Sequence, residues 1–409
     1  MTTEFQERGC ASPLDGWYRS KLGEKCTGLR KLGRGSIFGA TIEERRTGTA
    51  QCRIGGKWFV NFGSAEVLGL DADPRVRKLA REFIDQWGTC CGASRVYQYP
   101  VLYDQLERRI VQTTNAEQAI AFNSVTTVHC GVLPSLTRTG NFTIIIDRHA
   151  HNSMWRAADI CAARGSVVKQ FPHNDIAEVS RLLQSTDGKL PIVVVDSVYS
   201  MSGDFAPIKE LYALVNEHNG LLYVDDAHGT GLHGDHGGGY VTRELGRLPP
   251  NILVVGSLSK ALCGYGGFLA CGPEYREFVE CAAEGFLFNG PIPAPMLGAD
   301  LAVFDILLSH EYSSMRTALA DRQQRVRSVL ENAGFTIIAP ASHIFAISMT
   351  EKKAVALAQH LFEAGVLVNL ALFPAVPLKA GLIRLTPGLL HTDEDTRVLA
   401  AALQGFAKG

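Results

Sequence analysis

The sequence predicts an α/β protein in which a mostly parallel sheet of about seven strands forms the main domain and a smaller α+β domain follows it. Between residues 100 and 270, short apolar runs alternate with amphipathic stretches of helical spacing. Such alternation requires crossover connections, and these produce a parallel sheet covered by helices on both faces. A chain of 409 residues is also too long for one simple core, so two packed domains are expected.

The first 60 residues are expected to form an N-terminal arm. Glycines break this region into short segments, and it ends in a predicted hairpin around Gly55-Gly56 with residues 57–60 as a strand. Residues 76–87 then have helical spacing and stop at Gly88, which predicts a helix.

The large domain is expected to span residues 61–300 and to contain the sheet. Helix-like stretches such as 176–183 and 209–218 separate its strands, which are predicted at 119–122, 143–146, 167–171, 192–195, 221–224, 252–255 and 268–271. Ligands of such sheets sit beyond the carboxyl ends of the strands. The polar residues that follow each apolar run are therefore candidates for chemistry.

Residues 301–409 are expected to form the smaller domain. A helical stretch runs through Leu330, and a strand at 344–348, a helix at 354–362 and a strand at 366–370 are predicted after it.

The composition gives no reason to expect several classes of partner and site. Forty basic and 41 acidic side chains nearly cancel, so nothing favours nucleic acid or an anionic membrane as a partner. No apolar run approaches the ~20 residues of a membrane span, and the N-terminus lacks the layout of a signal peptide. The ten cysteines show neither CxxC spacing nor a disulfide framework. We therefore expect no metal site and a reduced, cytoplasmic setting.

Lys260 is the first candidate for chemistry. It follows a buried-type apolar run in Gly256-Ser257-Leu258-Ser259-Lys260 and precedes a glycine-rich loop. Burying an ammonium group is costly, and a lysine in such a place can form a Schiff base with an aldehyde cofactor. The alternative is an ordinary surface lysine in a flexible loop.

A second candidate group follows the apolar run that ends at Val224. Asp225 at a strand end can pair with a pyridinium nitrogen and make the ring an electron sink, while His228 can reach a ring oxygen. The alternatives are a helix cap for Asp225 and a loop histidine for His228. A third polar segment, 196–204, also follows an apolar run directly and includes Ser200; its alternative is a plain turn.

These segments, in this order, resemble the α-oxoamine synthase family of fold-type I pyridoxal 5′-phosphate enzymes. The similarity runs from about residue 60 to 400. The segments that carry it are Val224-Asp225-Asp226-Ala227-His228-Gly229-Thr230-Gly231, Gly256-Ser257-Leu258-Ser259-Lys260, Leu68-Gly69-Leu70, Gly92-Ala93-Ser94-Arg95, Asp147-Arg148-His149-Ala150-His151-Asn152-Ser153, Phe171-Pro172-His173-Asn174-Asp175 and Ile383-Arg384-Leu385-Thr386.

The resemblance implies a role for each matching residue. Lys260 matches the Schiff-base lysine and Asp225 the partner of the pyridine nitrogen. His228 matches the residue that binds the phenolic oxygen of the cofactor, with Ser200 near the same oxygen. His151 matches the histidine that stacks on the ring, although a register shift would put His149 there. The phosphate-binding positions match Ser257, Ser124, Val125 and Thr126.

The substrate positions depart from the family pattern more than the cofactor positions do. Arg384 matches the arginine that holds the substrate carboxylate, and a guanidinium fork suits that task; its alternative is a surface arginine. Ala65 stands where the family has a carboxylate-binding asparagine. Val125 replaces a glycine of the phosphate loop. These departures indicate a specialised biosynthetic member with an unusual substrate.

The resemblance implies a decarboxylative condensation of an amino acid with an acyl thioester, carried by coenzyme A or by a carrier protein, which yields an α-amino ketone. Lys260 would remove the α-proton and His151 would polarise the incoming carbonyl. A homodimer is implied as well. Two alternatives stay open: another fold-type I reaction on an amino acid, such as transamination, aldol cleavage or simple decarboxylation, and a catalytically silent partner subunit.

Overall fold

The computed structural model describes residues 14–20, 23–24, 27–28, 37 and 39–407. Two of the cysteines considered above, Cys10 and Cys26, lie outside these residues. The chain divides into two compact units, one formed by 65–324 with 388–390 and the other by the described parts of 1–64 with 325–387 and 391–409. This division differs from the expected segments 1–60, 61–300 and 301–409, because the N-terminal segment groups with the C-terminal residues.

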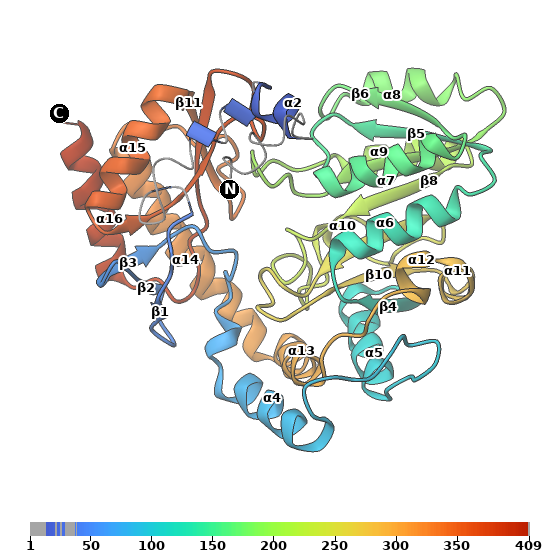
Figure 1. The fold of residues 1–409 in the computed structure, drawn as a ribbon, viewed down its shortest axis with the longest axis horizontal. Coiled ribbons are helices and arrows are strands. Elements are labelled where there is room, and N and C mark those ends of the chain that lie inside the picture. Colours follow the sequence, from blue (N-terminus) through green and yellow to red (C-terminus); the bar gives the residue numbers. More distant parts are fainter. Residues whose placement is uncertain (1–13, 21–22, 25–26, 29–36, 38, 408–409) are drawn as a thin grey trace, which may run out of the picture. The chain divides into compact units, whose positions relative to one another are not determined.

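The larger unit contains a seven-stranded sheet, and all seven predicted strands are present in it (Figure 1). In spatial order the strands are β4 (Gln118–Phe122), β10 (Gly267–Cys271), β9 (Ile252–Ser257), β8 (Leu221–Asp225), β7 (Leu190–Asp196), β5 (Phe142–Asp147) and β6 (Val167–Phe171). The five strands from β9 to β6 pair in parallel, as predicted. Only β10 among the seven runs against its neighbours, pairing antiparallel with both β4 and β9.

Helices of the larger unit connect and cover these strands. They are α4 (Pro74–Trp87), α5 (Leu102–Thr114), α6 (Val125–Leu136), α7 (Asn152–Ala163), α8 (Ile176–Leu183), α9 (Ile208–Glu217), α10 (Tyr240–Leu245), α11 (Pro273–Ala282), α12 (Glu284–Leu287) and α13 (Ala294–Leu307), together with the short 3-10 helix η1 (Leu70–Ala72). The predicted helix at 76–87 is α4. It begins where Asp73 caps the N–H of Arg75 and Pro74 takes the first helical position, and it ends at Gly88.

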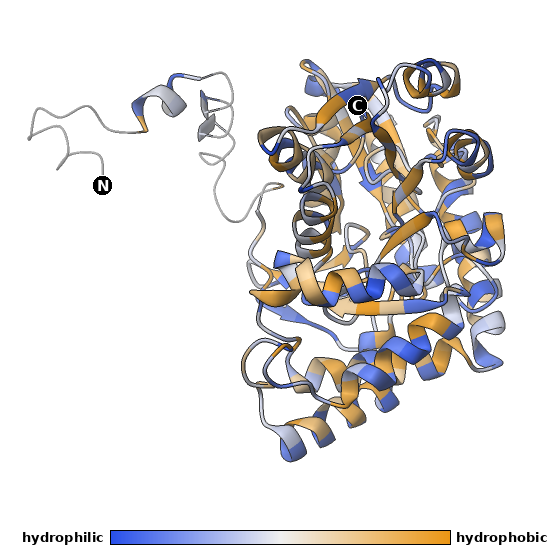
Figure 2. Ribbon diagram, turned by 90° about the vertical axis from the view of Figure 1, so that its right-hand side faces the viewer, coloured by the Kyte–Doolittle hydropathy of each residue, from blue (hydrophilic) through white to orange (hydrophobic). Residues whose placement is uncertain are grey.

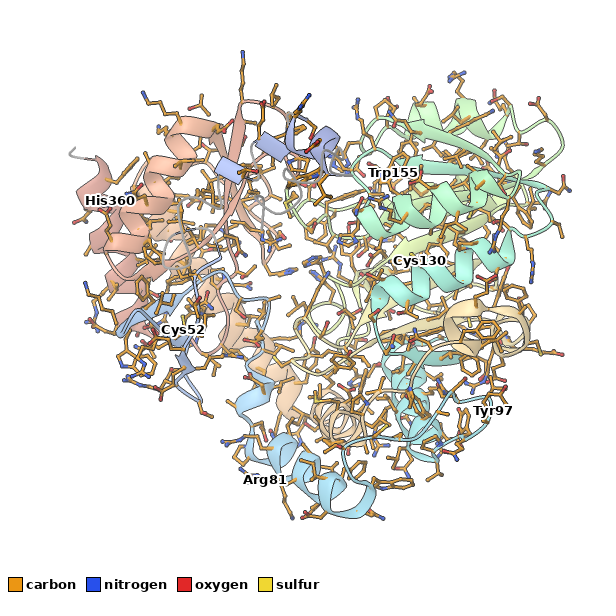
Figure 3. The ribbon with its side chains drawn as sticks, in the orientation of Figure 1. Cys52, Arg81, Tyr97, Cys130, Trp155 and His360 are labelled. Carbon is orange, nitrogen blue, oxygen red and sulfur yellow. The ribbon has the colours of Figure 1, made fainter. Side chains whose placement is uncertain are left out.

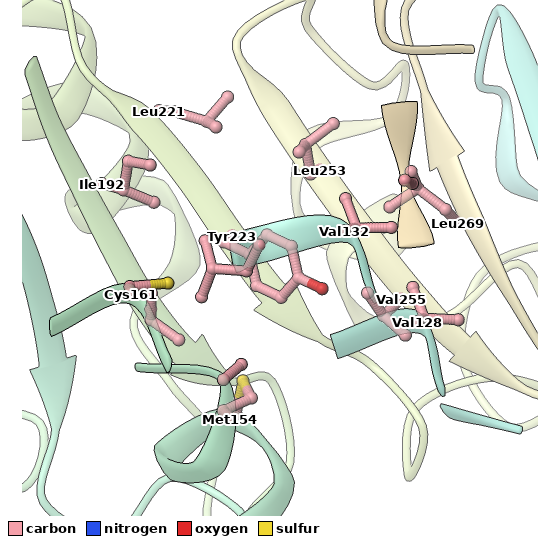
Figure 4. Packing of buried hydrophobic residues seen from close by; sticks show 14 of the residues in the cluster. Val128, Val132, Met154, Cys161, Ile192, Leu221, Tyr223, Leu253, Val255 and Leu269 are labelled. Atoms are coloured by element: carbon pink, nitrogen blue, oxygen red, sulfur yellow. The ribbon is translucent and has the colours of Figure 1, made fainter. Parts of the chain in front are cut away.

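The core of the larger unit lies between the sheet and α6 and α7. Alternate residues of each strand point to one face, and on this face the strand residues, such as Ile144, Ile192 and Tyr223, are buried against Val128 of α6 and Met154 of α7 (Figure 4). The central strands of the sheet are largely hydrophobic, whereas the helices carry both hydrophilic and hydrophobic segments (Figure 2). The polar residues at the carboxyl ends of these strands therefore follow directly on a packed core.

The smaller unit contains two sheets and the remaining helices. One sheet orders β1 (Glu44–Arg45), β2 (Gln51–Ile54), β3 (Lys57–Asn61) and β12 (Val366–Leu367), and the other orders β11 (Phe345–Thr350), β14 (Ala380–Leu385) and β13 (Asn369–Ala371). Its helices are α2 (Asp15–Tyr18), α15 (Glu351–Glu363) and α16 (Asp393–Ala407), and α14 (Glu311–Asn332) crosses the division between the units. The hairpin predicted around Gly55-Gly56 is the β2–β3 pair.

One predicted strand of this unit is interrupted. Residues 366–370 were expected to form a single strand, but β12 pairs with β3 while β13 pairs with β14. The chain passes from one sheet to the other at Val368, which is buried. Within the residues described, no helix is both long and apolar enough to cross a membrane.

Candidate active site

Asp225 is the last residue of β8, and its carboxyl group is almost fully buried at 5 % exposure. Its Oδ1 accepts the backbone N–H of Ala227 at 2.9 Å, and its Oδ2 lies 2.9 Å from the Nε2 of His129. Burial by itself raises the pKa of Asp225, but the charge and hydrogen bond of His129, with the charge of Lys260, outweigh it and hold the pKa below its ordinary value. The group is therefore a buried carboxylate.

Lys260 lies on the connection between β9 and β10, and its side chain is half-buried. The backbone of this connection is tied by the N–H of Cys263, which donates to the carbonyl of Lys260 at 2.9 Å. The charge of Lys260 acts on the carboxyl group of Asp225 and on the imidazole of His151. The structure thus brings together three residues that lie far apart in the sequence.

His151 is the N-cap residue of α7, and hydrogen bonds hold both its backbone and its ring. Its backbone N–H donates to Asp196 Oδ1 at 2.9 Å, while its ring Nδ1 accepts the N–H of Ser153 at 3.3 Å and lies 2.7 Å from the Ser153 hydroxyl. Because Nδ1 accepts, a neutral ring carries its proton on Nε2. Burial lowers the pKa of His151, which favours this neutral form.

His149, the alternative to His151, lies elsewhere. Its ring stacks on His173, with the ring centroids 4.3 Å apart, and His173 in turn contacts Asp147 and Asp204. The charge of Lys260 thus acts on His151, whereas that of His173 acts on His149, and the role of His151 at the ring stays a prediction.

His228 and Ser200 lie on the turns that follow β8 and β7, respectively. Both side chains are half-buried and both have interaction partners. The turn after β7 is closed by the N–H of Gly203, which donates to the carbonyl of Tyr199 at 2.8 Å. Asp196 and Asp225 are directly paired in the β7–β8 register. The two turns therefore start from adjacent positions at one edge of the sheet.

Ser257 and Ser124 flank the same glycine. Gly267 of β10 pairs with Ser257 on one side and with Phe122 on the other. A Cβ added to Gly267 would lie 2.8 Å from the backbone nitrogen of Val125, so the glycine lets the N-terminus of α6 approach the sheet. Ser124 caps α6 by accepting the N–H of Thr127. Val125 and Thr126 are the first two helical residues, whose N–H groups have no intrahelical acceptor.

These residues fit pyridoxal 5′-phosphate. A buried carboxylate suits a protonated pyridine nitrogen, a lysine amine suits an aldehyde, and the N-terminus of a twelve-residue helix suits a phosphate. Lys260, Asp225 and the Ser124–Thr126 segment would hold these three parts of the cofactor. Among the described residues no cluster of His, Cys, Asp or Glu could hold a metal ion.

The two candidate substrate residues belong to different units. Arg384 lies on β14 of the smaller unit, where it pairs with Ala346 and Asn369, and burial lowers its pKa. Ala65 begins the larger unit and offers only its backbone carbonyl, which accepts the N–H of Val67. Their roles stay predictions.

Sequence reasoning missed two buried residues of the site. Asp196 was quoted only as part of a polar segment, yet it holds the backbone of His151. His129, the partner of Asp225, lies in the middle of α6 and is fully buried. A single histidine within a helix has no local pattern that could have indicated its partner.

Comparisons with known proteins agree with this fold and with this cofactor. The aminotransferase class I and II family model matches residues 57–403. The 8-amino-7-oxononanoate synthase of Geobacter metallireducens is 32 % identical over 87 % of this chain and 90 % of its own length, and that of Geobacter sulfurreducens is 32 % identical over 86 % and 90 %. The structure of a Sphingomonas wittichii serine palmitoyltransferase superposes with a TM-score of 0.88 at 26 % identity, covering 97 % of this chain and 98 % of the other. The chain therefore belongs to the aminotransferase class I and II family and, within it, to the α-oxoamine synthases.

Proposed function

We propose that this chain joins an amino acid to an acyl thioester with loss of carbon dioxide and release of the thiol, giving an α-amino ketone. The observation that carries the proposal is the grouping of Lys260, Asp225 and His151 at the carboxyl edge of one sheet. The relatives named above support the same class of reaction. In the balanced reaction the α-carbon loses a proton and its carboxylate, gains a bond to the acyl carbon, and is finally reprotonated, while the C–S bond breaks.

The residues of the chain have separate tasks in this reaction. When bound, the cofactor supplies an electron sink that stabilises negative charge on the α-carbon. The Asp225 carboxylate keeps that sink charged. The Lys260 amine takes the proton from the α-carbon and can return one to it. The Nε2–H of His151 donates to the thioester carbonyl oxygen as negative charge develops there.

The substrate residues are part of the same proposal. We assign the substrate carboxylate to Arg384, with Ala65 leaving room where the family has an asparagine, and the ring oxygen to His228 and Ser200. Ala65 leaves Arg384 with less help in holding that carboxylate, and we assign the chain a specialised biosynthetic role.

We also infer a homodimer. Val96, Tyr97 and Val101 on one loop and Phe288 on a second expose between 51 % and 83 % of their surface (Figure 3 labels Tyr97). The hydroxyl of Ser94 donates to the carbonyl of Leu287 at 2.8 Å and joins the two loops. An exposed apolar area of this kind suits a protein partner. Light scattering should give twice the chain mass, and Phe288→Asp should lower it.

A cytoplasmic location is part of the proposal. All eight cysteines in the described part of the chain are free thiols, and four of them, Cys52, Cys91, Cys161 and Cys271, are buried. Free thiols in this number are typical of a reducing compartment.

The direct test is release of coenzyme A. The purified enzyme with cofactor is incubated with single amino acids and a pooled set of acyl-coenzyme A substrates, and free coenzyme A is measured by mass spectrometry. A colorimetric thiol reagent would also react with the exposed Cys90 and Cys281. Release that depends on one amino acid is expected, with loss of activity in Lys260→Ala and no change in Lys209→Ala, a surface lysine paired with Glu244.

Two other outcomes decide between the remaining reactions. Carbon dioxide released from a carboxyl-labelled amino acid only when an acyl-carrier protein is present would identify the carrier as the donor. Amino-acid turnover without any thioester would replace the condensation by transamination, aldol cleavage or simple decarboxylation. No turnover and no cofactor binding would overturn the proposal.

A further inference from the structure

His129 contacts Asp225 from behind the proposed cofactor site. It lies in α6, is fully buried, and places Nε2 2.9 Å from Asp225 Oδ2 and Nδ1 3.0 Å from the hydroxyl of Tyr223. Tyr223 and Asp225 are two residues apart on β8, so their side chains leave the same face of the strand. The three side chains form a continuous row from the core to the carboxyl edge of the sheet.

The direction of the hydrogen bonds in this row can be assigned. A carboxylate can only accept hydrogen bonds, so the Nε2 of His129 carries a proton and donates a hydrogen bond to Asp225. Burial raises the pKa of Tyr223 well above its ordinary value, so its hydroxyl keeps its proton and can donate to Nδ1. Both ring nitrogens of His129 are thereby engaged in hydrogen bonds. Figure 4 shows the Tyr223 hydroxyl pointing toward the side of the core where Val128 of α6 lies.

A second buried carboxyl group lies beside Asp225. Asp196 is its direct partner in the β7–β8 register and is 3 % exposed. Burial, followed by the charge of Asp225, raises the pKa of Asp196 well above its ordinary value. Two adjacent buried carboxyl groups cannot both be ionised without a large cost. The proton of this pair therefore resides on one of them.

The hydrogen-bond donors around the two carboxyl groups determine which of them is ionised. Asp225 receives a side-chain N–H from His129 and a backbone N–H from Ala227, whereas Asp196 receives the backbone N–H of His151. The other charged groups around the pair are less selective, because the charge of Lys260 acts on both carboxyl groups and that of Asp147 acts on Asp196. His129 is the donor that distinguishes them.

We propose that His129, supported by Tyr223, is the positioning residue that keeps Asp225 rather than Asp196 as the ionised member of this pair, facing the ring nitrogen of the cofactor. The inference rests on the proposed function only in requiring that the cofactor binds. A histidine that merely fills the core would affect stability and nothing else.

The test reads the ring nitrogen directly. Holoenzyme is prepared with pyridoxal phosphate labelled with ¹⁵N in the ring, and the ¹⁵N chemical shift is followed between about pH 6 and pH 9 in the wild type, His129→Phe, His129→Gln and Tyr223→Phe. His129→Phe should lower the pH at which the ring nitrogen loses its proton by about one to two units. In His129→Gln, which retains a donor, the ring nitrogen should lose its proton at a pH between those of the wild type and His129→Phe. Tyr223→Phe should lower this pH by less than His129→Phe does.

Val128→Ala is the matched control for lost packing. Val128 precedes His129 on α6, is fully buried and contacts the same core, so its truncation should destabilise the protein and leave the ring nitrogen unchanged. A folded His129→Phe enzyme with a wild-type ¹⁵N titration would overturn the proposal. Should that variant fail to fold, Tyr223→Phe decides, because it removes one oxygen and keeps the ring. A wild-type protein that binds no cofactor would instead refute the proposed function.

Discussion

The backbone N–H of His151 donates to Oδ1 of Asp196, 2.9 Å away. This bond joins the start of α7 to the last residue of β7, so the histidine is positioned by its main chain before its ring makes any contact. Its ring is then oriented by Ser153. The position of His151 is thus determined by a buried carboxyl group that never needs to touch the substrate.

Replacement of His151 should impair the chemical step more than substrate binding. His151→Asn is expected to lower kcat by about 10²–10⁴-fold, since it removes the Nε2–H donor, with little change in the KM of the amino acid. The lowered pKa of His151 keeps the ring neutral below the ordinary histidine range. Wild-type kcat should consequently persist below about pH 6.5. Ser153→Ala, which retains the backbone N–H, is the control with a smaller effect, and an unchanged kcat in His151→Asn would contradict the assignment.

His173 should make stability fall as the solution becomes alkaline. Its Nε2 lies 2.6 Å from Asp204 and its Nδ1 3.2 Å from Asp147. Burial lowers the pKa of His173, but the hydrogen bonds and charges of the two carboxylates outweigh burial and raise the pKa to about 9. Because this folded-state pKa lies above the unfolded value of about 6.5, His173 contributes its full stabilisation below pH 6.5. That stabilisation is lost as the pH rises to 9.

The corresponding measurement is urea unfolding of wild type and His173→Gln at several pH values. At pH 6 the variant should lose on the order of 2 kcal/mol, and the difference should shrink by pH 9.5. His218→Gln, which removes an imidazole whose Nδ1 donates to the Leu214 carbonyl and not to a carboxylate, is the control for the loss of an imidazole. A pH-independent difference for His173→Gln would be incompatible with a charged His173.

Replacement of Glu107 should destabilise the protein far more than replacement of Arg276, its partner nearer the solvent. Its Oε1 lies 2.7 Å from Arg95 and its Oε2 2.9 Å from Arg276, and the N–H of Ala121 also donates to Oε1. The Arg95 pair is almost completely buried. Glu107→Gln leaves a buried guanidinium without its countercharge and should cost about 3–5 kcal/mol. Arg276→Gln, nearer the solvent, should cost about 1 kcal/mol. Unfolding in guanidinium chloride measures both costs. Equal losses of unfolding free energy in the two variants would contradict the prediction.

Asp300→Asn should stabilise the protein. Asp300 is buried in α13, its Oδ1 accepts the N–H of Tyr265, and its Oδ2 has no hydrogen-bond partner within the described residues. Burial raises its pKa well above the ordinary value, so stability is lost as pH rises above about 4 toward the folded-state pKa. An amide keeps the acceptor and removes this loss. The unfolding free energy of Asp300→Asn should exceed that of the wild type by about 1–2 kcal/mol at pH 8 and by less at pH 4. A lower unfolding free energy at both pH values would show that ionisation of Asp300 does not destabilise the protein.

Much of the fold could be predicted from the sequence because the central strands of its large sheet are buried along almost their whole length. Continuous apolar runs such as 192–195 and 221–224 have few other structural solutions, and all seven predicted strands occur. The direction of β10 could not be predicted, because an apolar run carries no information on strand direction. The interruption at Val368 was missed for a related reason, since both sheets bury the same kind of residue.

Site residues could be predicted where they directly follow a predicted strand. They could not be predicted where their role depends on a contact with another strand or helix. Lys260, Asp225 and His151 each follow an apolar run in short, recognisable segments. His129 and Asp196 act through contacts that cross the sheet or a helix, and nothing in their neighbouring residues indicates those contacts.

The antiparallel direction of β10 has a consequence for the reactive lysine. A parallel neighbour of β9 would need a crossover of a dozen or more residues, whereas residues 258–266 return directly into the same sheet. Both ends of the segment that carries Lys260 are therefore fixed a strand spacing apart. The backbone that carries the amine has little conformational freedom to lose when the lysine reacts, so the entropy of placing that backbone is lost once, during folding, and not again in every turnover.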